Sequence, residues 1–201
     1  MRAIVMSIKS RFAHVVKPGC HFLLRRFSAM PRNVEIKAKL PNPTKSSEVA
    51  KTLSGKEGSL LVQEDTFFTV PQGRLKLRIE SNSKAKLIQY NRPDKEGPKL
   101  SDFCIALVED GESLKTTLTR ALGVVGIVKK HRMLYLVGQT RVHIDEVEGL
   151  GHFLELEVML EDSQTEQDGQ AIAEDLMKKL NVSESDLITN AYIDLLLSLK
   201  K

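Results

Sequence analysis

Apolar and polar residues alternate along most of the chain beyond residue 32. Between residues 34 and 40, for example, Val34, Ile36 and Ala38 alternate with charged residues. A period of two places successive side chains on opposite faces of the backbone, so this pattern predicts a β-strand. The same pattern, interrupted by Pro and Gly turn residues, predicts strands at about 34–40, 60–69, 74–80, 84–92, 99–108, 124–137, 139–147 and 151–160.

Four other segments carry apolar residues at helical spacing. Helices are predicted at about 44–53, 110–123, 164–180 and 185–199, with Asp110 as the N-cap of the second. The last of them has an apolar stripe that includes Leu187, Ile188 and Leu195. Many strands and few helices predict an α+β fold, a closed eight-stranded antiparallel β-barrel with the helices packed outside.

The second face of these strands is unusually ionic. Arg74, Lys76 and Arg78 share one face of a predicted strand, and charged residues alternate with apolar ones in later strands too. One interpretation is that each charged face is solvated, as charged faces usually are. The alternative is that helices cover the apolar faces, so that the charged faces point into the barrel. An eight-stranded barrel has room inside for side chains or one small ligand.

The balance of charges on these faces indicates what such a ligand would be. Cationic side chains outnumber acidic ones, and Arg and Lys are the usual binders of phosphate oxygens. The carboxylates are Glu35 and a later group of Asp145, Glu155 and Glu157. Oxygen ligands of this kind suit a hard cation such as Mg²⁺ or Mn²⁺. Because buried charges need counter-ions, the pattern predicts a polyphosphate bridged by a divalent cation.

The first 30 residues differ in composition from the rest. Residues 1–34 contain seven basic residues and no Asp or Glu, so the remaining chain is slightly acidic despite the overall charge of +4. A basic, acid-free leader with scattered apolar residues is typical of a mitochondrial transit peptide, and Arg25-Arg26-Phe27-Ser28 has the form of a matrix-processing site. Alternatively, translation begins at Met30 and the protein is cytoplasmic. In both cases residues 1–30 stand outside the folded domain.

Cysteine content and hydropathy narrow the class of protein and its cellular compartment further. Cys20 and Cys104 fit neither a disulfide framework nor a zinc site, which favours a reduced intracellular compartment. No stretch approaches the roughly 18 apolar residues of a membrane-spanning helix. The basic residues beyond the leader lack interleaved aromatic residues, so we expect no nucleic-acid partner. A monomer and a homodimer remain open.

Several short motifs follow one another along residues 33–198. They are Glu35 to Lys39, Gln63 to Phe68, Gly73 to Arg78, Leu87 to Pro93, Val128 to Arg132, Arg141 to Asp145, and Gly151 to Glu157. Together they resemble the CYTH superfamily, also called triphosphate tunnel metalloenzymes, which includes thiamine triphosphatases, inorganic triphosphatases and class IV adenylate cyclases. The resemblance implies a single tunnel-barrel domain over residues 31–201.

The resemblance also implies roles for individual residues. The metal ligands would be Glu35, Asp145, Glu155 and Glu157, and Glu157 and Lys39 would take part in catalysis. The phosphate-binding residues would be Lys39, Arg74, Lys76, Arg78, Arg92, Lys130, Arg132 and Arg141. His143 is expected to belong to the charge lattice, and Tyr90 and Phe153 to the packing.

This sequence departs from the family pattern in ways that bear on the reaction. Lys37 stands where the opening E-x-E-x-K signature has its second glutamate, and Phe67 replaces a tyrosine of the thiamine triphosphatase branch. We therefore expect metal-dependent hydrolysis of inorganic triphosphate or of a nucleoside or other organic triphosphate. The alternatives are an adenylate cyclase of class IV type, which makes cyclic AMP from ATP, and a non-catalytic polyphosphate-binding protein.

Overall fold

The structure is a computed structural model that describes residues 32–81, 83–91 and 99–200. Eight strands and four α-helices make up this part of the chain. The strands are β1 (Arg32–Lys39), β2 (Ser59–Phe68), β3 (Arg74–Glu80), β4 (Ala85–Asn91), β5 (Lys99–Val108), β6 (Val124–Val137), β7 (Thr140–Val147) and β8 (Gly151–Met159). The helices are α1 (Pro43–Ser54), α2 (Gly111–Leu122), α3 (Glu166–Lys179) and α4 (Tyr192–Ser198), with a 3₁₀ turn at Glu184–Asp186.

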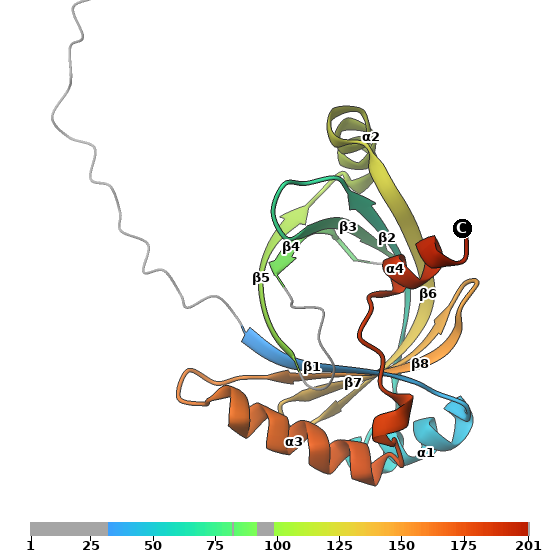
Figure 1. Ribbon diagram of the computed structural model, residues 1–201, viewed down its shortest axis with the longest axis vertical. Coiled ribbons are helices and arrows are strands. Elements are labelled where there is room, and N and C mark those ends of the chain that lie inside the picture. Colours follow the sequence, from blue (N-terminus) through green and yellow to red (C-terminus); the bar gives the residue numbers. More distant parts are fainter. Residues whose placement is uncertain (1–31, 82, 92–98, 201) are drawn as a thin grey trace, which may run out of the picture.

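All neighbouring strands are antiparallel, and the sheet curls round on itself (Figure 1). The order of pairing is β1-β5-β4-β3-β2-β6-β7-β8, and β8 pairs with β1 again. Within the described residues, the seam between β1 and β5 is short: its ladder has four residue pairs, from Arg32↔Asp102 to Glu35↔Lys99, against seven between β1 and β8. The antiparallel α+β fold is therefore confirmed, and β1 closes the sheet by pairing with both β8 and β5. Because the seam with β5 is narrow, the sheet has the form of a curled half-barrel, less complete than the closed eight-stranded barrel that we expected.

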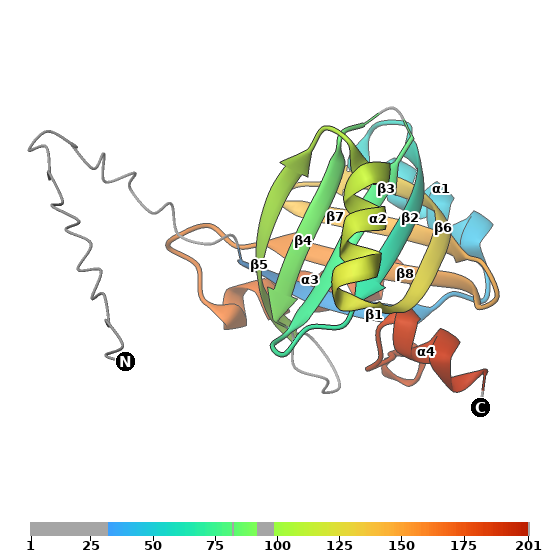
Figure 2. The same cartoon turned by 90° about the horizontal axis from the view of Figure 1, so that it is seen from above.

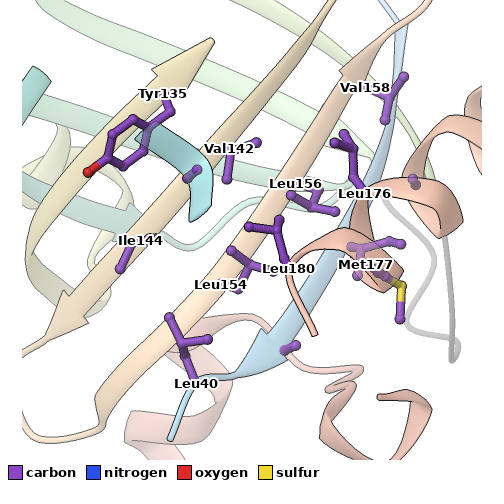
Figure 3. Packing of buried hydrophobic residues seen from close by; sticks show 14 of the residues in the cluster. Leu40, Tyr135, Val142, Ile144, Leu154, Leu156, Val158, Leu176, Met177 and Leu180 are labelled. Carbon is purple, nitrogen blue, oxygen red and sulfur yellow. The ribbon is translucent and has the colours of Figure 1, made fainter. Parts of the chain in front are cut away.

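The outer faces of β1, β7 and β8 hold the main hydrophobic core, beneath α1 and α3 (Figures 1 and 3). Val142, Leu154 and Leu156 point outward from the sheet and are 1% exposed or less. They meet Leu176 and Met177 of α3. On β1, β7 and β8, the period-two pattern thus places the apolar residues outside the barrel, under helices, which leaves the charged residues of these strands on the inner face.

Two smaller clusters cover the other side. Helix α2 packs over β2 and β3 (Figure 2), where Leu77 is fully buried. Asp110 caps this helix as expected, by accepting a hydrogen bond from the Ser113 amide. Helix α4 packs against β6, where Gly126 permits a close approach, because a Cβ there would lie 2.6 Å from Cδ1 of Ile193.

The end of the chain differs from the prediction. The single helix expected over 185–199 is a 3₁₀ turn, an extended segment and the short α4. In the extended segment, the Ile188 amide donates to the carbonyl of Lys37, and Leu187 forms a bridge with Ala38. Pairing with β1 therefore overrides the helical spacing of the apolar stripe, and it brings Tyr192 to the inside of the barrel. No helix in the described ranges combines the length and the hydropathy required to cross a membrane.

Candidate functional site

The inner faces of the strands line a cavity to which all eight strands contribute. The segment that leads into α4 adds Ala191 and Tyr192. The charged residues that line the cavity are Glu35, Lys37, Asp65, Lys76, Arg78, Lys130, Arg141, Glu155 and Glu157. For these residues, the inward-facing interpretation of the ionic pattern is confirmed.

Three cationic side chains converge on the carboxylate of Asp65. Arg78 donates hydrogen bonds of 2.6 and 2.7 Å to its two oxygens, while Nζ of Lys76 lies 3.1 Å and Nζ of Lys130 lies 3.4 Å from Oδ2. Burial alone would raise the pKa of Asp65, but the charges of Arg78, Lys76 and Lys130 hold this pKa well below its usual range. Because one buried carboxylate balances three cations, this side of the cavity has surplus positive charge.

Burial and the surplus of positive charge lower the pKa of the lysines in this part of the cavity. Burial, together with the charge of Arg132, lowers the pKa of Lys130 to about 7. Burial and the charge of Arg78 also lower the pKa of Lys76. An anion that enters this space supplies the missing counter-charge and stabilises the protonated ammonium groups. Phosphate oxygens fit best, since they accept several charge-assisted hydrogen bonds at once.

A second cluster, of opposite character, adjoins the same cavity, and two of its members, Glu155 and Glu157, line it. His143, Glu155 and Glu157 each offer a ligand atom, and these atoms lie within 4.8 Å of one another. Nδ1 of His143 lies 3.9 Å from Oε1 of Glu155 and 3.8 Å from Oε1 of Glu157. This nitrogen is buried and has no hydrogen-bond partner in the described part of the chain. An unpartnered nitrogen beside two carboxylates fits a divalent cation.

The protonation states also suit a cation. Burial and the charge of Arg132 hold the pKa of His143 well below its usual range, so the imidazole is neutral near pH 7, as a ligand must be. Burial and the neighbouring charge of Glu155 raise the pKa of Glu157 to about 7. For Glu155, burial acts in the same direction, but the charges of Lys37 and Arg132 outweigh it and lower the pKa well below its usual range.

The four carboxylates expected to bind metal do not form one group. Glu155 and Glu157 belong to the cluster, and Glu35 lines the cavity as the register partner of Glu157. Asp145 does not line it and is fully buried, where it accepts two hydrogen bonds of 2.6 Å from Arg132 and one of 2.9 Å from the Tyr192 hydroxyl. These donors occupy its oxygens, so in this structure Asp145 orients Arg132 and Tyr192. Its role as a metal ligand stays a prediction.

The residues that we expected to bind phosphate do not all line the cavity. Lys76, Arg78, Lys130 and Arg141 line the cavity, and Nη1 of Arg141 lies 3.5 Å from Oε2 of Glu157. Arg92 lies outside the described residues.

The other three lie apart from the cavity lining. Arg132 is engaged by Asp145 and Glu155, and Arg74 forms an ion pair of 2.8 Å with Asp194. Lys39, although on the inner face of β1, is exposed and does not line the cavity. This position does not favour the catalytic role expected for Lys39.

Several residues of the site were not assigned to it from the sequence. Asp65 shares the strand parity of Gln63 and Phe67, so alternation placed it on the charged face, but nothing local marks it as the partner of three cations. Lys37 seemed a substitution of a ligand, yet its ammonium pairs with Glu155 and lies 4.0 Å from the centre of the Tyr192 ring. Tyr192 comes from a segment predicted to be helical, and no periodicity places it in the barrel.

Fold and site together define a class of protein, a β-barrel whose inner face carries a group of cations beside a cluster that could hold a metal ion. The family model for the CYTH domain matches residues 31–192. The chain therefore belongs to the CYTH domain family, and the resemblance seen in the sequence is confirmed.

Individual relatives agree with this assignment. The chain is 29% identical to a Methanocaldococcus jannaschii protein named "Putative adenylate cyclase", over 81% of this chain and 97% of that protein. It is 28% identical to adenylate cyclase CyaB of Aeromonas hydrophila, over 65% and 70% of the two chains. Among solved structures, the PH1012 protein of Pyrococcus horikoshii superposes with a TM-score of 0.72 at 25% identity, over 81% of this chain and 98% of that one.

Proposed function

We propose that the protein is a metal-dependent phosphohydrolase that removes the terminal phosphoryl group of a triphosphate. One observation carries this proposal: the surplus cations around Asp65 line the same cavity as Glu155 and Glu157, the two carboxylates of the cluster that His143 completes. A phosphate chain that spans the cavity would satisfy both groups, because its oxygens would accept hydrogen bonds from the cations, while the carboxylates would hold a divalent ion that offsets the remaining phosphate charge.

Each group has a distinct task in this reaction. Lys76, Arg78 and Lys130 hold the phosphate oxygens and stabilise the negative charge that develops on the departing group. Arg141, exposed at one side of the cavity lining, binds a phosphate at the end of the chain. His143 and Glu155 would hold a divalent cation, which would supply positive charge that neutralises phosphoryl oxygens.

Glu157 is the group best suited to accept a proton from the attacking water. Its pKa of about 7 matches the range in which a general base operates efficiently. Membership of the CYTH family, with its triphosphate-acting members, supports the choice of substrate. We do not extend the proposal to a thiamine triphosphate specificity, because Phe67 offers no phenol to the cavity.

The second candidate function is that of an adenylate cyclase. The names of the two relatives favour it. The same cations and metal ligands would hold ATP while its ribose 3′-hydroxyl attacks the α-phosphate, so that cyclic AMP and pyrophosphate form.

The products distinguish the candidates. The purified full chain is incubated with Mg²⁺ or Mn²⁺ and with inorganic triphosphate, ATP, GTP or CTP, and phosphate, pyrophosphate and cyclic AMP are quantified. We expect phosphate release that falls at least about 100-fold in Glu157→Gln, since general-base catalysis contributes factors of this size. The surface variant Lys51→Ala is the matched control and is expected to retain full activity.

Two results contradict the proposal. Cyclic AMP and pyrophosphate as the main products from ATP would establish the cyclase instead. Tight binding of triphosphate and metal without turnover of any compound would establish a non-catalytic binding protein.

A further inference from the structure

One wall of the cavity is apolar. On β4 and β5, the inward-facing residues form two directly opposed cross-strand pairs, Ile88↔Ile105 and Tyr90↔Phe103. All four line the cavity that Lys76, Arg78, Lys130, Glu155 and Glu157 also line. The ionic residues come from the remaining strands, so the cavity has a charged side and an apolar side.

The apolar wall is only partly covered. Ile105 is 47% exposed although it faces the cavity, and Tyr90 and Phe103 are partly exposed. Apolar surface of this kind gains free energy when a ligand displaces water from it. Inorganic triphosphate, which is ionic throughout, would leave this surface in contact with water.

Lys76 joins the two sides. Its ammonium lies 5.6 Å from the centre of the Phe67 ring and 5.5 Å from that of the Tyr90 ring, while it also pairs with Asp65. A phosphate bound by Lys76 therefore lies next to an aromatic surface. A group attached to that phosphate is directed along Tyr90 and its neighbours.

A buried amide adds a polar contact beside the apolar wall. Asn33, on β1, lines the cavity and is 5% exposed, and its Oδ1 has no hydrogen-bond partner in the described part of the chain. Asn33 pairs with Ser101 of β5, and Phe103 is the next residue on the same face of that strand. Such diagonal neighbours lie roughly 7–8 Å apart, within reach of one ligand ring. An unpartnered buried acceptor calls for an N–H or O–H donor on that ligand.

We propose that this apolar wall and Asn33 bind the organic part of the substrate, a nitrogen-containing aromatic ring that donates a hydrogen bond. The site then selects an organic triphosphate over inorganic triphosphate. This inference rests on the proposed function, since it assumes that the charged side holds a triphosphate. A nucleobase has the required chemistry.

The test measures binding, independently of turnover. Calorimetry with Mg²⁺ compares the β,γ-imido analogue of ATP, inorganic imidotriphosphate and an alkyl triphosphate that has no ring. We expect the full chain to bind the nucleotide analogue at least about tenfold more tightly than the other two, a difference of about 1.4 kcal/mol.

Variants locate the source of that preference. Phe103→Ala/Ile105→Ala and, separately, Asn33→Ala are expected to weaken nucleotide binding about tenfold and to leave inorganic imidotriphosphate within about twofold of the wild-type affinity. Leu107→Ala is the matched control, because Leu107 lies on the same strand, is 67% exposed and does not line the cavity. Retained affinity for the inorganic ligand also shows that each variant is folded.

The outcomes separate this inference from the proposed function. The inference is overturned if wild type binds the three ligands with equal affinity. It is also overturned if the Phe103→Ala/Ile105→Ala and Asn33→Ala variants lose as much affinity for inorganic imidotriphosphate as for the nucleotide analogue. Either result leaves the triphosphate site intact. A preference for the nucleotide over the alkyl triphosphate that survives both wall variants also overturns the inference. Failure of all three ligands to bind refutes the proposed function itself.

Discussion

Lys37 and Glu155 are direct register partners on β1 and β8, and their side chains form an ion pair inside the barrel. Nζ of Lys37 also lies 3.8 Å from Oε1 of Glu35. The ammonium is thus held between two carboxylates, one of which belongs to the metal-binding cluster. The ammonium group of Lys37 therefore lies beside the position that we propose for the divalent ion.

The first prediction follows from this competition. Lys37→Met keeps most of the side-chain volume and removes the charge, so Glu155 becomes a stronger ligand although it retains Arg132 at 3.1 Å. We expect Mn²⁺ affinity, measured by calorimetry without triphosphate, to rise about tenfold, since one lost charge–charge repulsion in a poorly solvated site exceeds 1 kcal/mol. Lys51→Met is the control at the surface. Unchanged affinity would mean that Lys37 and the metal ion do not share Glu155.

The second prediction compares two acidic residues that the sequence did not distinguish. Asp145→Asn breaks a buried ion pair with Arg132 and is expected to lower the free energy of unfolding by about 3 kcal/mol. Glu157→Gln should leave stability nearly unchanged, because removing a carboxylate repelled by Glu155 causes little loss, but it should weaken Mn²⁺ binding about tenfold. Urea denaturation and calorimetry provide the two measurements. The opposite result, with metal binding lost only in Asp145→Asn, would identify Asp145 as a ligand.

The third prediction concerns pH. Lys130 has a folded-state pKa of about 7 against 10.5 in a model compound, so between these values the unfolded chain binds more protons and stability rises with pH. The neutral Lys130→Met should be more stable than wild type below about pH 7, and its advantage should shrink as pH rises toward about 10. The groups that act on this ammonium from the surrounding elements are Asp65, Arg78, Arg132, Asp145 and Tyr192.

Ligand binding should also be linked to the protonation of Lys130, but in this case the protonated form is favoured. A polyanion restores the charged form of Lys130, so binding without metal at pH 8 is expected to take up protons, an uptake that Lys130→Met reduces. Calorimetry in buffers of different ionisation enthalpy measures the uptake. Equal uptake in both proteins would exclude Lys130 as its source.

The fourth prediction concerns residues 1–30, which lie outside the described part of the chain. We propose that this basic, acid-free segment directs import into mitochondria. A fluorescent protein fused after residue 34 should enter mitochondria, and cleavage near Arg25-Arg26-Phe27-Ser28 should appear as a shortened product. Changing Arg25 and Arg26 to Gln is expected to reduce cleavage. A reporter that stays in the cytosol would favour initiation at Met30.

Much of the fold could be predicted because alternation is a local property. Arg74, Lys76 and Arg78 share a strand face whatever surrounds them, and the apolar residues between them require a covering layer. Antiparallel strands, outer helices and an ionic inner face follow from that pattern. The narrow seam between β1 and β5 could not be predicted from that pattern, because it depends on how far two strands that are distant in the sequence remain paired.

The sequence by itself determined which side chains share a strand face and that cations and carboxylates both occur on the inner one. Only the tertiary structure decided which of them meet. Asp145 and Glu157 have the same chemistry, yet one is enclosed by Arg132 and Tyr192 and the other faces the cavity. The reason is that ion pairing depends on distances of a few ångströms across different strands, and these distances are set by register, barrel curvature and the path of the C-terminal segment.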